Sequence, residues 1–330
     1  MNEVDLSRDP GSAASSIAAF PPVCNCWFLT GPTASGKTGL GLELAECLNA
    51  EIISLDSMAI YLGMDVGTAK PTPADRQRVP HHMLDLVEPN RSFSLSEYVA
   101  GAHCKIHEIQ RSGRTVLFVG GTPLYLKALL RGVFPGPPAD WEFREQVEEE
   151  LKTVGIEALH GRLQQVDPLL AAKLHPHDKR RIIRALEVYK HTGQPLSHEQ
   201  IQFEDRPAVD CRVFALGWMR PELHRRIEVR VERMFNQGLV DEVRSLRDQY
   251  GELSRTAEQA VGYREVIQHL QGHNDLDETI ASVKVRTRRF ARRQETWFRS
   301  LPECRRIDVD RRNDDAAIAQ AILELTSTSD

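Results

Sequence analysis

The pattern of apolar and polar positions predicts strands that alternate with helices in the first part of the chain. Short, continuously apolar runs occupy 23–30, 51–55 and 115–119, and 81–87 is a candidate for a further strand. Helical periodicity follows over 94–110 and 122–131, and Ser94 with Glu97 three residues later fits a capping box. Strands that are apolar throughout are typical of a parallel sheet with helices on both faces.

The pattern changes at Phe134, where a Pro- and Gly-rich segment ends the alternation. From 139 to 207 the periodicity is helical, and one clear helix in this stretch stops at Gly193. A single apolar strand returns at 211–218. The elements expected after it are helices over 222–250, 260–270 and 276–301, a short strand at 306–309 and a helix over 316–325. We therefore predict an α/β protein with an all-helical insertion domain.

Composition narrows the functional classes. The formal net charge is −5, which argues against binding nucleic acid over the whole surface. Basic residues nevertheless gather at 281–306, and a second cluster consists of Lys179, Arg180, Arg181 and Arg184. Local basic surfaces on a mildly acidic protein suggest a polyanion that docks at a defined place. No apolar run approaches the roughly 20 residues that a membrane helix needs.

The lack of a recognisable targeting signal and the scattered cysteines favour a cytoplasmic location. The first residues are acidic and rich in Gly, Ala and Ser, so we expect a flexible extension over 1–22 rather than a signal or transit peptide. The six cysteines are scattered and form no C-x-x-C pair. A reducing compartment, without structural disulfides or zinc, is therefore the expectation.

A glycine-rich loop joins the first apolar run to the first helical segment. Its sequence, GPTASGKT, satisfies the pattern G-x-x-x-x-G-K-[ST] of a P-loop in the strand–loop–helix context that the pattern requires. Backbone N–H groups and the helix dipole would hold phosphate oxygens, with Lys37 as a mobile charge and the Thr38 hydroxyl as a ligand for Mg²⁺. The predicted diphosphate-binding set is Gly31, Pro32, Thr33, Ala34, Ser35, Gly36, Lys37 and Thr38. The fold class is accordingly a P-loop NTPase-like parallel sheet flanked by helices.

The acidic residue nearest this site in the predicted topology is Asp56. It follows the second apolar run, so it and the P-loop lie at carboxyl ends of strands, where open α/β sheets bind ligands. Three interpretations stay open from the residues alone. Asp56 could deprotonate an acceptor hydroxyl in a kinase, face an acceptor amine in another transferase, or only cap the following turn together with Ser57.

The order of several longer segments resembles one family. The segments are GPTASGKT, ISLDSMAIYLGMDVGTAKPT, HHMLDLVEP, FVGGTPLYLKALLRG, RRIIRALEVYKHTGQPLS, VGYRE and RRQETWFR. They are similar to those of the tRNA dimethylallyltransferases, also called tRNA isopentenyltransferases, over about 28–300. The resemblance implies transfer of a dimethylallyl group from dimethylallyl diphosphate to N6 of adenine 37 in tRNA, with release of diphosphate and help from Mg²⁺. The chain lacks the zinc-finger segment that eukaryotic members often append, so it resembles the bacterial form.

The resemblance also implies roles for residues. Asp56 matches the catalytic acid that bonds the adenine N6, and Thr122 matches a threonine near the reacting centre. Lys37 joins the catalytic set on chemical grounds, because the charge of the leaving diphosphate has to be neutralised. The positions matched to tRNA contacts are Asp56, Ser57, Met58, Ala59, Thr122, Arg144, Arg180, Arg181, Ile182, Ile183, Arg184, Gln259, Ala260, Val261, Gly262, Tyr263, Arg264, Arg292, Arg293, Gln294, Glu295, Thr296, Trp297, Phe298 and Arg299. Ala59 stands where the family commonly has Gln, which puts recognition of a flanking nucleotide in doubt.

These expectations define four segments and their partners. After the extension over 1–22, the P-loop core occupies 23–138, the helical insertion 139–207, and the second part of the core, with basic tRNA-binding helices, 208–330. The expected partners are a tRNA anticodon stem-loop and dimethylallyl diphosphate, without a membrane. The working expectation is a monomer, although the sequence does not fix the oligomeric state, nor whether ATP also binds the P-loop. The alternative functions are a P-loop kinase of a small metabolite, a free-adenylate isopentenyltransferase and a non-catalytic RNA-binding protein.

Overall fold

A computed structural model of the chain describes residues 20–134, 136–198, 211–310 and 314–327. The expected extension over 1–22 lies almost wholly outside these residues. The described part forms two compact units. One comprises Phe20 and the described residues between Phe134 and His198, and the other comprises 21–133 together with the described residues from Cys211 onward. We call them the insertion unit and the core unit and describe each by itself.

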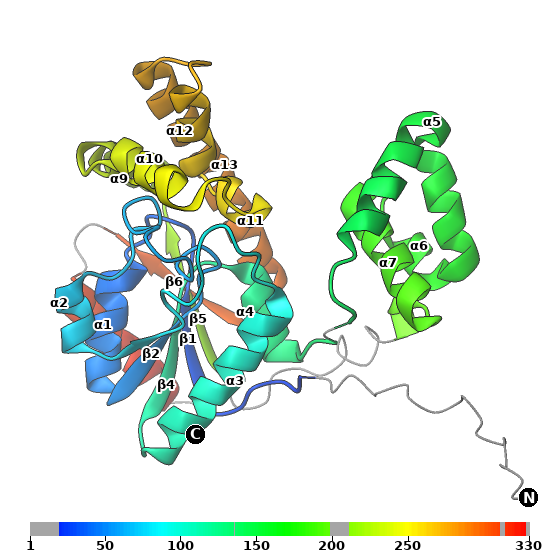
Figure 1. Cartoon of the computed structure of the whole chain (residues 1–330). Coiled ribbons are helices and arrows are strands. Elements are labelled where there is room, and N and C mark those ends of the chain that lie inside the picture. Colours follow the sequence, from blue (N-terminus) through cyan, green and yellow to red (C-terminus); the bar gives the residue numbers. More distant parts are fainter. Residues whose placement is uncertain (1–19, 135, 199–210, 311–313, 328–330) are drawn as a thin grey trace, which may run out of the picture. The chain divides into compact units, whose positions relative to one another are not determined.

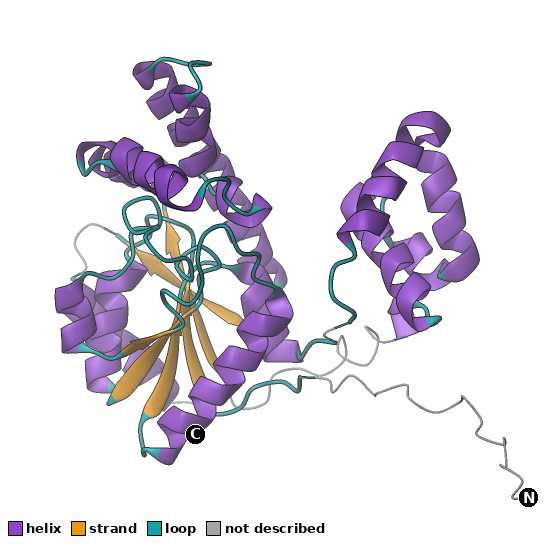
Figure 2. Cartoon of the chain, in the orientation of Figure 1, coloured by secondary structure: helices purple, strands orange, loops and turns teal. Residues whose placement is uncertain are grey.

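The core unit is built on a six-stranded sheet in the order β3-β2-β4-β1-β5-β6 (Figure 2). All neighbouring strands pair in parallel. The strands are β1 (Cys26–Thr30), β2 (Ala50–Ser54), β3 (His81–His82), β4 (Thr115–Val119), β5 (Arg212–Trp218) and β6 (Cys304–Val309). Every residue of β1 is buried, as expected for a central strand with helices on both faces. The predicted α/β class with a parallel sheet is thus confirmed.

The strand expected over 81–87 is shorter than predicted. Only His81 and His82 pair with β2, and one isolated bridge joins Val87 to Tyr61. Met83 and Asp85 have φ angles of 60° and 53°, which lie outside the extended region. The chain therefore leaves the sheet after two residues, although its apolar side chains resemble those of a strand.

Helices cover both faces of the sheet (Figure 1). On one face, α1 (Lys37–Cys47) packs against β2 and β4 and also contacts α14 (Asp315–Ser327), while the short α2 (Pro73–Arg78) precedes β3. On the other face, α3 (Leu95–Arg111) packs against β2 and β4 and beside α4 (Pro123–Arg131). The predicted capping box is confirmed, because the Ser94 hydroxyl accepts from the N–H of Glu97 and the Glu97 carboxylate accepts from that of Ser94.

A group of helices that follows β5 lies beyond the carboxyl ends of the strands (Figure 1). Its members are α9 (Arg220–Asn236), α10 (Leu239–Tyr250), α11 (Arg255–Glu258), α12 (Tyr263–Leu270) and α13 (Leu276–Ser300). The prediction of one helix over 222–250 was wrong, because the chain breaks at Gly238, whose φ is 90°. The break lets α10 turn back on α9, and both α9 and α4 pack against α13.

The described part of the insertion unit contains helices and no strand (Figure 2). They are α5 (Trp141–Val166), α6 (Pro168–Lys173) and α7 (Lys179–Thr192). Gly155 interrupts α5 with a φ of 81°, and Gly193 ends α7 as predicted. A small apolar core around Leu163, Ile182 and Leu186 holds the unit together.

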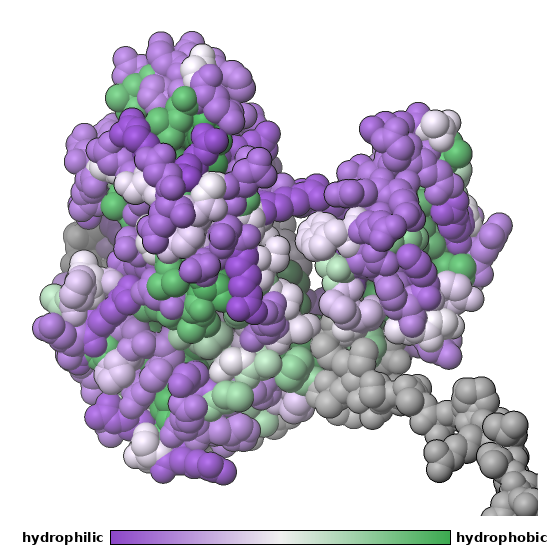
Figure 3. All heavy atoms as spheres, in the orientation of Figure 1, coloured by the Kyte–Doolittle hydropathy of each residue, from purple (hydrophilic) through white to green (hydrophobic). Residues whose placement is uncertain are grey.

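Figure 3 shows a mostly hydrophilic surface, with some hydrophobic side chains gathered in the middle of the visible face of the core unit. Large apolar side chains that are exposed in the loops of this unit include Leu62 and Leu86. Within the residues that the structure describes, no helix is long and apolar enough to cross a membrane.

Candidate active site

The P-loop follows β1, at the point of the sheet where successive strands are added first on one side and later on the other. From β1 the chain first crosses to β2 and β4 and later returns to β5 on the other side. Open α/β sheets bind ligands at the carboxyl ends of the strands beside such a reversal. Helix α1 begins at Lys37, after Gly36 has taken a left-handed φ of 93° that only glycine adopts at little cost. The positive end of α1 therefore faces the loop.

The side chain of Lys37 turns back onto the loop that carries it. Its Nζ donates to the carbonyl oxygens of Gly31 at 3.0 Å and Pro32 at 2.7 Å. Burial, together with the positive charge of Arg230, lowers the pKa of Lys37 to about 7, although Asp56 opposes the shift. The loop thus holds a lysine that is close to its protonation midpoint at neutral pH and that donates to two carbonyl oxygens and, at 3.4 Å, to the Ser35 hydroxyl.

The Thr38 side chain is exposed at the start of α1, next to Lys37. Among the described residues, no group of three or more His, Cys, Asp or Glu side chains could hold a metal ion. A hydroxyl at this position suits the way Mg²⁺ binds beside phosphates, where one or two protein oxygens suffice and substrate oxygens and waters complete the octahedron. The residues present therefore fit a Mg²⁺ ion that arrives with its diphosphate.

Asp56 follows β2 after one intervening residue and is half-buried. Its Oδ1 accepts hydrogen bonds from the backbone N–H groups of Met58 at 2.8 Å and Ala59 at 3.3 Å. The interpretation of Asp56 as a turn cap is thus partly correct, because one oxygen serves this purpose. Among the described residues, Oδ2 accepts no hydrogen bond. That oxygen is available to a ligand.

Thr122 joins the loop after β4 to the loop that carries Asp56. Its backbone N–H donates to the carbonyl of Leu55 at 3.1 Å, and its hydroxyl oxygen accepts from the N–H of Ser57 at 3.0 Å. The two residues that flank Asp56 in the sequence are therefore both tied to Thr122. This arrangement fixes the backbone of Asp56 relative to β4.

Gln294, on α13, joins the P-loop to the loop after β4. Its Oε1 accepts from the N–H of Thr33 at 2.8 Å, and its Nε2 donates to the carbonyl of Gly121 at 2.6 Å. A Cβ atom at position 121 would lie 2.7 Å from Nε2, so a larger residue there would displace the Gln294 amide. The expectation that the Gln294 side chain contacts tRNA is therefore corrected, since the amide is buried and both ends are engaged inside the protein.

Two arginines on α9 complete the site and were missed from the sequence. Arg226 donates from Nε to the carbonyl of Ala34 in the P-loop at 2.7 Å, with its guanidinium carbon 4.3 Å from the centre of the Trp218 ring. Arg230 donates from Nη2 to the carbonyl of Thr68 at 3.1 Å. Burial lowers the pKa of Arg230, and the negative charge of Asp56 opposes this shift. The sequence did contain a signal for them, because two arginines four residues apart lie on the same face of the helix that follows β5.

The arginines predicted to contact tRNA from the insertion unit divide into two groups. Arg180 and Arg181 are exposed at the start of α7. Arg144 and Arg184, in contrast, donate to the buried carboxylate of Glu187, from Arg144 Nε at 2.8 Å and also from Arg184 Nη1. Burial opposes ionisation of Glu187, but the hydrogen bonds from the two arginines outweigh it and lower its pKa.

The apolar members of this stretch, Ile182 and Ile183, are also corrected. Both side chains are buried in the core of the insertion unit, where they pack against the other helices of that unit. They stabilise α7 and do not offer a surface to RNA.

In the stretch 259–264 the polar ends are exposed and the middle is buried. Gln259 and Arg264 face solvent, and Val261 is partly buried. The side chains of Ala260 and Tyr263 lie in an apolar core with residues of α10, and Gly262 is buried at the start of α12. Direct RNA contacts by the Ala260 and Tyr263 side chains are therefore corrected to packing roles.

The stretch 292–299 presents one face of α13 to solvent. Arg292, Arg293, Thr296 and Arg299 are exposed, Glu295 and Trp297 are partly buried, and Phe298 is buried and packs inside. Within the described residues, Arg292 and Arg293 form no ion pair. Earlier on the same helix, Lys284 and Arg288 pair with Glu232 and Glu228. The free positive charge of α13 is thus concentrated in its second half.

The core unit thus brings Lys37, Asp56 and Thr122 to one edge of the sheet, as the sequence predicted. Ser57 and Met58 lie beside Asp56 and are partly buried, whereas Ala59 is buried and only its backbone takes part in the polar contacts of the loop. Position 59, where the family commonly has Gln, is therefore buried inside the protein.

A family model, relatives in sequence and solved structures all relate this chain to the same group of proteins. The model of the IPP transferase family matches residues 59–301. A tRNA dimethylallyltransferase from Rhodopirellula baltica is 53% identical over 287 residues, covering 84% of this chain and 86% of that protein. One from Syntrophobacter fumaroxidans is 46% identical over 283 residues, covering 85% of this chain and 82% of that protein.

Solved structures agree with these sequences. The full-length tRNA isopentenylpyrophosphate transferase from Bacillus halodurans superimposes with a TM-score of 0.66 at 37% identity, covering 92% of this chain and 98% of that one. A eukaryotic dimethylallyltransferase, described as acting on tRNA, gives a TM-score of 0.78 at 25% identity and covers 93% of this chain and 79% of that one. The chain belongs to the IPP transferase family.

Proposed function

We propose that the protein transfers the dimethylallyl group of dimethylallyl diphosphate to N6 of adenine 37 in tRNA and releases diphosphate. The observation that carries this proposal is the separation of charge at one edge of the sheet. A positive region made by the P-loop, Lys37 and Arg230 lies beside Asp56, whose Oδ2 accepts no hydrogen bond from the part of the chain that the structure describes. The names of the relatives support the same reaction.

The proposed mechanism follows from the substrates. An allylic C–O bond ionises readily once the leaving diphosphate is stabilised, and the exocyclic amine of adenine is a weak nucleophile. The P-loop N–H groups, the dipole of α1, Lys37 and Arg230 stabilise the negative charge that grows on the leaving group. As the new C–N bond forms, Asp56 accepts a proton from N6 through Oδ2. Thr122 keeps Asp56 in place through its bonds on both sides of it.

Thr38 is the protein ligand that we propose for Mg²⁺. When bound, the ion neutralises charge on the diphosphate oxygens. Lys37 has to leave the carbonyl oxygens of Gly31 and Pro32 and reach the phosphate in the same step. A nucleoside diphosphate or triphosphate presents the same phosphate oxygens, so we expect ATP to compete weakly for the P-loop.

The residues that we propose to contact tRNA are the exposed members of the predicted set, in each of the two units. They are Arg180 and Arg181 on α7, Gln259 and Arg264 beside α12, and Arg292, Arg293, Thr296 and Arg299 on α13. Arg144 and Arg184 contribute only those N–H groups that are not already engaged by Glu187 or, for Arg184, by the carbonyl of Pro137. Among the described residues, Arg292 and Arg293 form no ion pair, so they bind phosphates of an anticodon stem-loop without first breaking one, whereas Arg181 has to leave Asp178. Adenine 37 has to leave the stacked loop to reach Asp56. A monomer in the cytoplasm suffices for this reaction.

A transfer assay tests the proposal against its alternatives. The full chain is incubated with Mg²⁺, labelled dimethylallyl diphosphate and an anticodon stem-loop that has adenine or guanine at position 37. We expect label in the adenine RNA only. Label in free AMP would support a free-adenylate enzyme, and phosphate transfer from ATP to a small metabolite would support a kinase. RNA binding without any turnover would leave a non-catalytic protein.

A further inference from the structure

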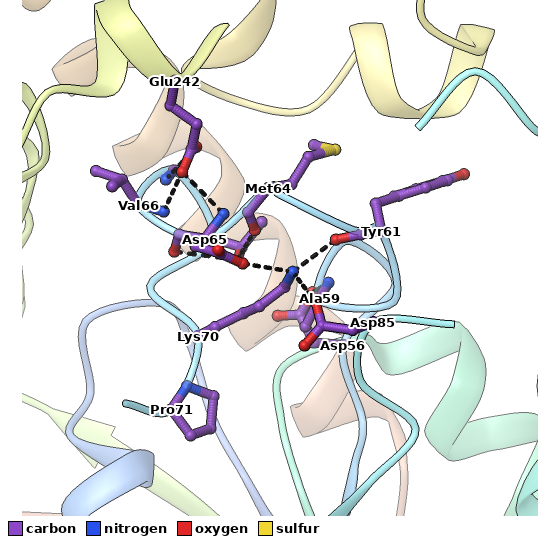
Figure 4. A network of polar contacts seen from close by, with 12 residues as sticks. Asp56, Ala59, Tyr61, Met64, Asp65, Val66, Lys70, Pro71, Asp85 and Glu242 are labelled. Carbon is purple, nitrogen blue, oxygen red and sulfur yellow. Dashed lines mark hydrogen bonds and ion pairs between the residues drawn. The ribbon is translucent and has the colours of Figure 1, made fainter. Parts of the chain in front are cut away.

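The segment that carries Asp56 is a long loop held from outside the sheet. We call residues 55–72, between β2 and α2, the Asp56 loop. At its far end, the carboxylate of Glu242 on α10 accepts three backbone hydrogen bonds (Figure 4). Oε2 accepts from the N–H groups of Asp65 at 2.9 Å and Val66 at 2.6 Å, and Oε1 accepts from Gly67 at 3.1 Å. Consecutive N–H groups that converge in this way form a nest for an anion, which Glu242 supplies from another element.

Tyr263 fixes Glu242 in turn. Its hydroxyl donates to Oε1 of Glu242 at 2.6 Å, and its ring is fully buried at the start of α12. A Cβ atom at position 67 would lie 2.4 Å from this ring, so the loop packs against it and only glycine fits there. The far end of the Asp56 loop is therefore held by α10 and α12 together.

Lys70 closes the loop on itself. Its ammonium group, with 2% of the side chain exposed, donates to the carbonyl of Tyr61 at 2.5 Å and to the carboxylates of Asp65 at 2.7 Å and Asp85 at 2.5 Å (Figure 4). Moving any of the three acceptors away from this buried ammonium group is costly, because the charge then loses part of the compensation that it needs inside the protein. Lys70 thus transmits the position of Asp65, which Glu242 holds, to the rest of the loop.

Backbone hydrogen bonds connect Asp85 to the carboxylate of Asp56. The N–H of Asp85 donates to the carbonyl of Ala59 at 3.2 Å, and that of Leu86 to the carbonyl of Ile60 at 2.7 Å. The N–H of Ala59 donates to Oδ1 of Asp56. A continuous series of hydrogen bonds therefore runs from Tyr263 and Glu242 through Lys70 and Asp85 to Asp56.

We infer that Glu242 is a positioning residue for the transfer reaction, which acts by holding the Asp56 loop so that Oδ2 of Asp56 meets the acceptor amine. This inference rests on the proposed function. Arg230 also donates to the loop, at Thr68, but its own position is set by α9. A loosened loop therefore displaces Asp56 before it displaces the groups that hold diphosphate.

The test compares three variants of the full chain. Glu242→Gln keeps the length of the side chain but turns one acceptor into a donor that faces N–H groups. Tyr263→Phe removes one hydroxyl bond and leaves the carboxylate. Asp241→Asn is the matched control, because this exposed neighbour on the same turn of α10 pairs only with Arg244 in the described chain. Each variant is assayed for kcat with the adenine stem-loop, and its Kd for inorganic diphosphate is measured by calorimetry well below its Tm.

A displacement of about 1 Å at a reacting group costs on the order of 100-fold in rate. We therefore expect Glu242→Gln to lower kcat by about 10- to 100-fold with a Kd for diphosphate within about threefold of wild type. Tyr263→Phe should have a smaller effect, and Asp241→Asn should match wild type.

Three results would overturn the inference. They are a kcat of Glu242→Gln close to that of wild type, a parallel loss of diphosphate binding, which marks general unfolding, or an equal loss in Asp241→Asn. The wild-type protein, assayed alongside the variants, tests the proposed function separately. If wild type transfers no label, both proposals fail, whereas transfer by wild type and Glu242→Gln alike contradicts only the inference.

Discussion

At the scale of single residues, the contacts of Lys37 predict how diphosphate binding depends on pH. Its ammonium group is buried among backbone carbonyls and near Arg230, so its pKa lies at about 7. An arriving diphosphate replaces the carbonyls with full negative charges. These favour the charged form, and binding above pH 7 is therefore coupled to uptake of a proton.

This coupling gives a pH dependence with a defined sign. We expect the affinity for inorganic diphosphate to fall as the pH rises above about 7, by up to about tenfold per pH unit, because the lysine is neutral in the free protein. Calorimetry in buffers with different ionisation enthalpies measures the proton uptake. In Lys37→Met only the titration of the ligand itself should remain. An identical pH dependence in Lys37→Met and wild type would show that Lys37 does not titrate in this range.

Gln294 gives a second test at this scale. Gln294→Leu leaves the N–H of Thr33 and the carbonyl of Gly121 without partners in a buried place. Each unsatisfied buried group costs about 1–3 kcal/mol, so we expect a lower free energy of unfolding and weaker diphosphate binding. Denaturant unfolding measures the first effect and calorimetry the second. Thr296→Val, at an exposed position two residues later, is the control. Diphosphate binding equal to wild type would contradict the role of Gln294 in shaping the P-loop.

At the scale of elements, α13 has two functions on different faces. The inward face carries Gln294 and Phe298 into the core, and the outward face carries arginines. Because Lys284 and Arg288 are paired with acids of α9, only the second half of the helix offers free charge to a polyanion. A count of basic residues along 281–306 does not reveal this difference, since the acids that neutralise them come from another helix.

The difference between paired and unpaired arginines on α13 predicts that two variants bind RNA with unequal affinity. Arg292→Ala/Arg293→Ala should weaken binding of the anticodon stem-loop and reduce the slope of log K against log salt by about 0.7 for each lost phosphate contact. The KM for dimethylallyl diphosphate should not change. Arg288→Ala, which removes a paired charge from the same helix, should have a smaller effect. Fluorescence titrations at several salt concentrations measure both. Equal losses in the two variants would show that pairing within the protein does not decide which arginines bind RNA.

Several elements could be predicted from the sequence because their signals are local. The apolar runs of β1, β2 and β4 and the capping box of α3 lie in adjacent residues. The division of 222–250 into α9 and α10 could not be read from periodicity, because it depends on whether Gly238 takes a left-handed conformation. That choice is decided by packing of α10 against α9 and α12, which periodicity does not contain.

At the scale of the whole molecule, the shared position of the P-loop and Asp56 was predictable from the sequence, and the residues that hold them in place were not. The P-loop pattern and Asp56 follow strands in the sequence, so their shared edge could be inferred. Gln294 and Arg230 reach the site from helices that lie far away in the chain. Their roles depend on tertiary contacts. For the same reason Tyr263 and Ile182, which the family resemblance matched to RNA contacts, lie in the core of their units.

The central claim is that Asp56 receives the proton from the acceptor amine while the P-loop holds the leaving group. Asp56→Asn tests it most directly, because the amide keeps an oxygen for the N–H groups of Met58 and Ala59 but cannot act as a base. The measurement is kcat for transfer to the adenine stem-loop, together with Kd for inorganic diphosphate. The account predicts a loss of kcat on the order of 10²- to 10⁴-fold with diphosphate affinity nearly unchanged. A variant that transfers the dimethylallyl group at the wild-type rate would contradict it.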